Sequence, residues 1–275
     1  MMDRFGWISG ARWGRAGLAL VGATTVAVVA AAMGLLDPLA FLITVGGALA
    51  VTRATFSAEA IRHARERLLE ALEPRGGEDV EAKELISTFK RFARIHRVDG
   101  APALDEAVQE EDDPFLRRAV QQCLTCSHSD ELREGLFGEA RVRASEGEQA
   151  RSVLLTLGRL FPAFGLIGTL IGLVMVLRSL GGEEGLATVA PALGVTVLTT
   201  LYGAVLANVV VLPLATKLHA HLARENVQMK MIIHGVEMLH EREYPTRIER
   251  ALRAHAGLPN VEESIGLTVL HERAA

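Results

Sequence analysis

Aromatic side chains are scarce in this sequence. Phenylalanine, tyrosine and tryptophan together make up only 5% of its 275 residues, although 49% of the residues are hydrophobic. A large soluble core takes much of its bulk from aromatic rings, so this balance argues against an ordinary soluble protein. The hydrophobic residues are instead aliphatic or small and gather in long runs, which is typical of a membrane protein.

Cysteine is also rare and gives no complete metal site. Cys123 and Cys126 form one C-x-x-C pair with His128 close by, which would offer two or three zinc ligands. A tetrahedral zinc site needs a fourth ligand and usually a second pair of residues. The pattern therefore favours two reduced thiols in the cytoplasm over a zinc centre.

Catalytic and phosphate-binding patterns are missing as well. The glycine-rich segment GLIGTLIG (165–172) is not preceded by a predicted strand and not followed by the Lys-Ser/Thr of a Walker loop. No nucleophile, base and orienting residue form a recognisable arrangement. We expect no enzyme activity, no cofactor and no nucleic acid partner.

Charge is absent from four stretches of the chain. Residues 16–36, 38–52, 160–177 and 185–216 contain no Asp, Glu, Lys or Arg, and about 20 apolar residues cross the ~30 Å hydrocarbon layer. The second stretch is short and would cross if it were tilted or extended a little past its ends. The first stretch is too long for a cleaved export signal and is followed at once by another hydrophobic run. We therefore expect four transmembrane helices, the first of which is a retained anchor.

Basic residues mark the ends of the spans that face the cytoplasm. They precede the first span and follow the second and the fourth, whereas the other two linkers are a two-residue turn and the loop SLGGEE. Both ends of the chain are therefore expected in the cytoplasm. The basic residues are Arg4, Arg12, Arg15, Arg53, Arg62, Arg65, Arg67, Lys217 and Arg224.

The predicted fold is an all-α membrane protein with a helical cytoplasmic domain between the second and third spans. Between these spans, charged segments keep apolar residues near a 3.6-residue spacing, and no stretch alternates like a strand. The expected parts are a cytoplasmic N-terminus (1–15), spans one and two (16–56), the cytoplasmic domain (57–152), spans three and four (153–216) and a cytoplasmic helical tail (217–275).

Small residues and hydroxyl groups line one side of the third and fourth spans. Such faces suit close helix packing, with each hydroxyl bonded to its own helix, or they suit a water-accessible ion path. An ion path needs a buried Asp, Glu or His, and none lies deep inside these spans. Either there is no ion path, or a transmembrane helix of another chain supplies the carboxylate and inserts against these faces. The aligned residues are Gly165, Gly168, Thr169 and Gly172 on the third span and Thr196, Thr200, Gly203 and Ala207 on the fourth.

Four segments together resemble a known family. They are residues 37–47 (DPLAFLITVGG), 161–177 (FPAFGLIGTLIGLVMVL), 191–217 (PALGVTVLTTLYGAVLANVVVLPLATK) and 232–235 (IIHG). They are similar to the flagellar stator subunits MotA and PomA, which are relatives of the ExbB and TolQ energisers. The resemblance implies that several copies of a four-span subunit form a ring around two transmembrane helices of MotB or PomB. A single aspartate of that partner carries the ion, which is a proton or a sodium ion.

The resemblance also implies roles for residues of the third and fourth spans. Pro162 and Pro213 match prolines associated with the conformational step, since a proline removes a backbone hydrogen bond and permits a bend. Thr200 matches the threonine that faces the partner's aspartate. Thr169 stands where sodium-driven members tend to carry threonine and proton-driven members alanine, and a hydroxyl oxygen suits a dehydrated sodium ion. Thr196, where alanine is usual, adds another hydroxyl to the path.

The cytoplasmic segment RVDGAPALD (97–105) is similar to the family pattern R-x-x-G-x-x-x-L-E. The resemblance implies that Arg97 and Asp105 contact the switch protein of the rotor, with Asp one methylene shorter than the usual Glu. Without the resemblance, these charges would be interpreted as part of a solvated helix. Opposite charges across such a contact would mainly speed the encounter of the two proteins and fix their alignment, and would add little to affinity.

The expected function is that of a flagellar stator subunit in the bacterial inner membrane, in contact with lipid, a MotB/PomB-like partner and the rotor. The alternative is an ExbB- or TolQ-like energiser of another envelope, motility or defence process. Four spans, a short outer loop and the Arg97/Asp105 motif favour the stator, because ExbB- and TolQ-like relatives usually have three spans.

Overall fold

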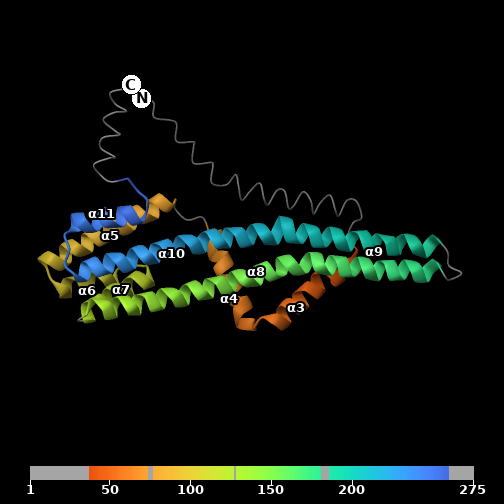
Figure 1. Ribbon diagram of the computed structural model, residues 1–275, viewed down its shortest axis with the longest axis horizontal. Helices are drawn as coiled ribbons and strands as arrows, with labels where there is room; N and C mark the ends of the chain where they lie inside the picture. The colour runs from red at the N-terminus through yellow and green to blue at the C-terminus, as the bar shows by residue number, and fades with distance from the viewer. Residues whose placement is uncertain (1–36, 74–76, 127, 181–185, 260–275) are drawn as a thin grey trace, which may run out of the picture. The chain divides into compact units, whose positions relative to one another are not determined.

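The computed structural model describes residues 37–73, 77–126, 128–180 and 186–259 (Figure 1). Most of these residues are helical, and this described part of the chain contains no β-strand, in agreement with the predicted all-α class. The first predicted span, residues 16–36, lies outside the described residues.

The chain divides into two compact units. We call residues 1–74 and 147–219 the membrane unit, and residues 75–146 and 220–275 the helical unit. The described elements, in chain order, are α2 (Pro38–Phe41), the π-helical turn η2 (Leu42–Gly46), α3 (Gly47–Thr55), α4 (Ala58–Leu72), α5 (Glu78–Val98), α6 (Ala101–Gln109), α7 (Pro114–Thr125), α8 (Ser129–Leu180), α9 (Leu186–Val205), the π-helical turn η3 (Leu206–Val211), α10 (Leu212–His240) and α11 (Pro245–His255).

Three helical stretches among the described residues are long and apolar enough to cross a membrane. They are Pro38–Thr55, α8, and the stretch from Val189 to His240, and they contain the second, third and fourth predicted spans. Both α8 and α10 continue well beyond the uncharged segments and have residues in both units. The membrane-spanning segments are therefore joined to the helical unit by unbroken helices.

The second span begins with a capped helix end that is fixed to α9. The Asp37 carboxylate accepts a hydrogen bond from the backbone N–H of Ala40 at 2.8 Å. Pro38 occupies the first helical position, where its missing N–H leaves no partner unsatisfied. The backbone N–H of Asp37 donates to the Tyr202 hydroxyl at 3.0 Å, and the Phe41 ring packs edge-on against the Tyr202 ring. Tyr202 thus ties the start of the second span to the fourth.

A wider π-helical turn interrupts each of two spans, η2 in the second and η3 in the fourth. Pro213 follows η3 as the second residue of α10. Proline has no N–H to donate and its ring crowds the carbonyl one turn earlier, and a wider turn before it relieves this crowding. Within η3, the Asn208 side chain donates to the Ala204 carbonyl at 2.9 Å. The sequence patterns predicted neither π-helical turn.

The core of the helical unit contains fully buried aromatic rings. Phe89 of α5 and Phe115 of α7 are at most 1% exposed, and each buried ring of this size contributes on the order of 1.5–3 kcal/mol. Gly235 lets α10 approach α5, because a Cβ there would lie 2.7 Å from the Phe89 ring. Helix α11 lies along α5 (Figure 1). The two helices are joined by an ion pair in which Nζ of Lys90 on α5 lies 2.6 Å from Oε2 of Glu249 on α11.

Candidate functional site

Helices α8 and α9 approach each other closely within the membrane unit, at two of the predicted packing glycines. A Cβ at Gly203 would lie 2.5 Å from the carbonyl oxygen of Phe161, and a Cβ at Gly165 would lie 2.9 Å from the carbonyl oxygen of Thr199. Because the obstructing atoms belong to the backbone, a side chain at either position would force the two helices apart. The α8–α9 contact therefore depends on glycine at these positions.

Gly168 and Gly172 extend the same contact. Their missing side chains leave room for the side chains of Thr199 and Thr196, and a Cβ at Gly168 would lie 2.5 Å from the Cβ of Thr199. The Thr196 hydroxyl is half-buried and donates to the Ala192 carbonyl at 2.9 Å. Thr196 thus lies in the helix contact, with its hydroxyl hydrogen bonded to its own helix.

Of the other two threonines predicted to line an ion path, Thr200 is exposed and Thr169 is half-buried. Thr169 of α8 donates to the Leu166 carbonyl at 2.7 Å, and Thr200 of α9 donates to the Thr196 carbonyl at 3.4 Å. A hydroxyl that donates to its own helix keeps oxygen lone pairs, which accept a hydrogen bond or coordinate a cation. Thr200 lies beside Gly165, one turn from Thr169, since its Cα would be 3.4 Å from a Cβ there. The two hydroxyl-bearing residues therefore lie on adjoining helices at neighbouring levels.

Two buried threonines were not predicted as site residues. Thr44 of the second span and Thr199 of α9 are fully buried. The Thr44 hydroxyl donates to the Thr199 carbonyl at 3.4 Å, and the Thr199 hydroxyl donates to the Thr196 carbonyl at 3.0 Å. The only cue in the sequence was a hydroxyl within the apolar segment DPLAFLITVGG. These threonines connect the second span to the fourth by a polar contact inside the membrane unit.

The helix segments weakened by the two prolines predicted to support coupling, Pro162 and Pro213, meet on adjoining helices. Pro162 lies inside α8, and it removes the hydrogen bond that the Gly158 carbonyl would otherwise accept from residue 162. Gly158 faces the end of η3, because a Cβ there would lie 3.4 Å from Leu212 and 3.6 Å from Val211. Leu212 directly precedes Pro213. Two proline-weakened segments, far apart in the sequence, therefore meet at one level.

The predicted rotor motif forms the corner between α5 and α6. Gly100 has φ +87°, a backbone conformation that favours glycine, and it allows the chain to turn between the helices. Leu104 is fully buried and anchors α6 in the core of the helical unit. Arg97 is exposed at the end of α5, and Asp105 is half-exposed on α6. Among the residues that the structure describes, no hydrogen bond or ion pair joins these two charges.

Arg97 contacts the loop between α10 and α11, which the sequence did not indicate. Its Nη1 atom donates to the Arg242 carbonyl oxygen at 2.6 Å. Its guanidinium group lies over the Tyr244 ring, 3.9 Å from the ring centroid. The charge that the motif presents is therefore held by residues outside the motif.

Cys123 lies in the core of the helical unit as a protonated thiol. Burial raises the pKa of Cys123 to about 12, and the neighbouring Cys126 adds to the rise. Its sulfur lies 3.9 Å from Nδ1 of His240, whereas His128 is exposed. In the described ranges, no group of three or more His, Cys, Asp or Glu residues is arranged to hold a metal ion.

Residues 107–231 match the model of the MotA/TolQ/ExbB proton channel family. The chemotaxis protein PomA of Vibrio alginolyticus is 30% identical over 173 residues, which are 63% of this chain and 66% of PomA. Motility protein A of Cereibacter sphaeroides is 31% identical over 167 residues, which are 60% of this chain and 64% of that protein. The chain is thus similar to members of the MotA/TolQ/ExbB proton channel family. It spans a little under two thirds of the length of these two relatives.

The fold of this chain is also found in a solved structure. The flagellar MotAB stator complex from Bacillus subtilis matches it with a TM-score of 0.71 at 23% identity, over 85% of this chain and 93% of that chain. At this identity the likeness shows the fold alone, which is all-α. The three long apolar helices and the match to the family model indicate a multi-pass protein of the inner membrane. Similarity to a proton channel family agrees with the expectation that the chain is not an enzyme.

Proposed function

We propose that the chain is an ion-conducting stator subunit of the bacterial flagellar motor, working as a homo-oligomeric ring around a MotB/PomB-like partner. The observation that carries the proposal is the pair formed by the half-buried Thr169 and the exposed Thr200, on spans whose described residues include no Asp, Glu or His. Hydroxyl groups on such a face suit a transmembrane helix that brings its own carboxylate. The MotAB stator complex of Bacillus subtilis, with which this chain shares its fold, contains a second subunit, MotB.

The step that we assign to the ion is a change in how the partner's helix packs. A charged carboxylate inside a membrane is costly, and neutralising it with a proton or a sodium ion removes that cost. The partner's helix then fits differently against Thr200 and Thr169, with Thr196 behind them in the helix contact. The two states of the partner's carboxylate would thus favour two arrangements of α8 and α9.

The prolines and the long helices would transmit this change in helix packing to the rotor. Pro162 and Pro213 weaken α8 and the η3–α10 junction at one level, so a bend there costs less than elsewhere in the spans. Both α8 and α10 continue without a break into the helical unit, which carries Arg97 and Asp105. We propose that these two charges contact the switch protein of the rotor at each step.

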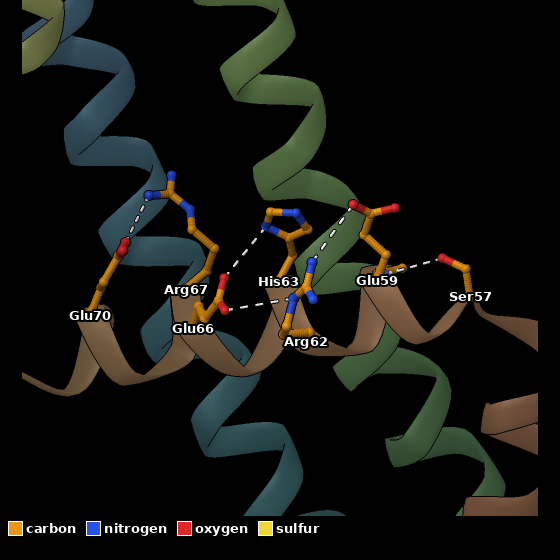
Figure 2. Close-up of polar contacts among 8 residues, drawn as sticks. Ser57, Glu59, Arg62, His63, Glu66, Arg67 and Glu70 are labelled. Atoms are coloured by element: carbon orange, nitrogen blue, oxygen red, sulfur yellow. Dashed lines mark hydrogen bonds and ion pairs between the residues drawn. The ribbon is translucent and has the colours of Figure 1, made fainter.

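The orientation that we propose places both chain ends and the helical unit in the cytoplasm. Some of the basic residues that indicate this orientation lie on α4, where they form ion pairs with neighbouring Glu residues (Figure 2). The guanidinium of Arg62 lies 3.7 Å from the Glu59 carboxylate and 3.9 Å from that of Glu66. The guanidinium of Arg67 lies 2.8 Å from the Glu70 carboxylate. Such exposed pairs add only about 0.3–0.5 kcal/mol each to helix stability. Membrane orientation depends on the number of Lys and Arg residues and not on net charge, so this pairing leaves the signal intact.

An ExbB- or TolQ-like energiser is the second candidate function, because the matching family model includes those subunits. The protein encoded beside this gene discriminates between the two candidates. A single span with an aspartate, followed by a peptidoglycan-binding domain, supports the stator. A partner with a TonB-type domain supports the energiser.

Rotation of a motor tests the stator proposal directly. We expect that the full chain, expressed with its single-span partner in a bacterium without stator genes of its own, restores rotation of tethered cells. Omitting the partner is the control and should leave the cells still. If both proteins reach the membrane and purify together but no motor turns, the stator function is wrong and the energiser candidate gains.

The Thr169 hydroxyl leads us to expect sodium coupling. Rotation should then require sodium, and Thr169→Ala should raise the sodium concentration for half-maximal speed by about fivefold, which corresponds to one lost oxygen contact of ~1 kcal/mol. Thr55→Ala is a matched control, because Thr55 also donates to its own helix, at Val51. Full torque of the wild-type chain in sodium-free medium would show that the ion is the proton.

A further inference from the structure

The end of helix α10 has an unusual residue at its closing position. The backbone N–H of Glu243 donates to the Met238 carbonyl at 3.0 Å, and that of Arg242 donates to the Leu239 carbonyl at 3.1 Å. This pair of bonds defines a Schellman motif, in which the residue of left-handed conformation is usually glycine. Here that residue is Arg242, with φ +54°, and it is the only non-glycine residue with positive φ in the described part of the chain.

The end of α11 shows the same motif in its usual form. The N–H of Leu258 donates to the Arg253 carbonyl at 2.9 Å, and the N–H of Gly257 donates to the Ala254 carbonyl at 3.3 Å. The left-handed residue there is Gly257, with φ +66°. The α10 end thus carries a side chain in a conformation where that side chain crowds the backbone. Strain of this kind is found where a structure serves a function beyond closing a helix.

The strained turn at Arg242 receives the Arg97 side chain. Its carbonyl accepts the hydrogen bond from Arg97, and Tyr244, two residues later, lies under the Arg97 guanidinium. The Tyr244 backbone is fixed by the start of α11, where its carbonyl accepts hydrogen bonds from the N–H groups of Arg247 and Ile248. Yet the Tyr244 residue is 63% exposed and contributes little to the core. The contact that the structure gives to its ring is the Arg97 guanidinium.

We propose that Tyr244 is a positioning residue for the rotor contact and that, with the Arg242 carbonyl, it holds Arg97 ready for an acidic side chain of the rotor. This inference rests on the proposed stator function. A guanidinium has five N–H donors, and the bond to Arg242 uses one of them. The remaining donors suit a carboxylate, which binds a guanidinium through two parallel hydrogen bonds.

Positioning matters here because an unrestrained arginine side chain is flexible. When a flexible side chain becomes fixed on binding, it loses conformational entropy, and this loss weakens association. The ring and the carbonyl restrict Arg97 before the rotor arrives. The exposed Arg242 side chain adds a second positive charge at this loop, which again favours an acidic partner.

Dwell time at the motor tests this role in cells that carry the full chain and its partner. With a fluorescent tag on the chain, Tyr244→Ala should shorten the time that each stator unit stays at a rotating motor by roughly two- to fivefold, as expected for an exposed cation–π contact. Tyr244→Phe keeps the ring and should retain the wild-type dwell time. In an Arg97→Ala background, Tyr244→Ala should cause no further loss, because Tyr244 acts through Arg97. A wild-type dwell time for Tyr244→Ala, or an additional loss in the Arg97→Ala background, would overturn the proposal.

Hydrogen exchange of the purified complex tests the contact without a motor. Amides of the 241–247 segment should exchange faster in Arg97→Ala and in Tyr244→Ala than in the wild type or Tyr244→Phe. Unchanged exchange in both alanine variants overturns the positioning contact even if the chain drives rotation. If exchange changes as expected but the wild-type chain turns no motor, the stator function is wrong, and the rotor role of Tyr244 is wrong with it.

Discussion

Replacing Gly203 by valine is expected to disrupt the membrane unit and to stop motor rotation. A Cβ at this position would lie 2.5 Å from the Phe161 carbonyl oxygen, which is a backbone atom that cannot turn aside. The two γ-methyl groups of valine add to the overlap, so α8 and α9 must separate beside Pro162. Overpacking typically costs about 1–3 kcal/mol, and folded proteins have only about 5–15 kcal/mol of stability to lose.

Gly194→Val is the matched control for this prediction. Gly194 lies on the same helix, α9, and no atom lies within 4 Å of a Cβ built there. Thermal unfolding of the purified chain in detergent should show a Tm that falls by roughly 2–4 °C for each kcal/mol lost in Gly203→Val. The Tm of Gly194→Val should stay near that of the wild type. Equal Tm values for Gly203→Val and the wild type would show that α8 and α9 are not held by this contact.

The second, third and fourth spans could be predicted from the sequence because each depends on local composition. A run without charge predicts a membrane helix wherever it packs, and Asp37 followed by Pro38 marks the start of the second span. The turn between α5 and α6 was predictable for the same reason. Gly100 with the following Pro102 breaks the helix, whatever the rest of the chain does.

The contacts between spans were not predictable, because they depend on how far one helix is shifted along another. The spacing of glycines on α8 identifies a face, but it does not say that Gly165 meets Thr199 or that Phe161 meets Gly203. The meeting of Gly158, one turn before Pro162, with Leu212, directly before Pro213, follows from the same shift. One sequence, taken one helix at a time, carries no information on this shift.

The three threonines of the candidate ion path illustrate the same limit. Helical spacing placed Thr196 and Thr200 on one face of the fourth span, four residues apart. In the structure Thr196 is half-buried against Gly172 and Thr169 is half-buried as well, whereas Thr200 is exposed. Thr196 and Thr200 differ in burial, although they lie on one face, because the neighbouring helix covers only part of that face. Thr200 therefore lies on the part of the face that remains open to a partner's helix.

Reversing the charge of Arg97, by Arg97→Glu, is expected to reduce swimming by at least tenfold while the chain still inserts in the membrane. The exposed guanidinium would be replaced by a carboxylate facing the acidic rotor residue that we propose as its partner. Like charges placed opposite each other cost several kcal/mol, and each 1.4 kcal/mol is a factor of ten in association. The contact with Tyr244 and the hydrogen bond to the Arg242 carbonyl would be lost at the same time.

Lys83→Glu is the matched control for Arg97→Glu. Lys83 is also exposed on α5 and undergoes the same change of charge, about 21 Å along the helix at 1.5 Å per residue. Swimming speed and the amount of chain in the membrane should both stay near wild type for Lys83→Glu, whereas only the speed should fall for Arg97→Glu. Changing the facing acidic residue of the switch protein to lysine should then restore swimming to Arg97→Glu cells. Unchanged swimming of Arg97→Glu cells would place the rotor contact elsewhere on the helical unit.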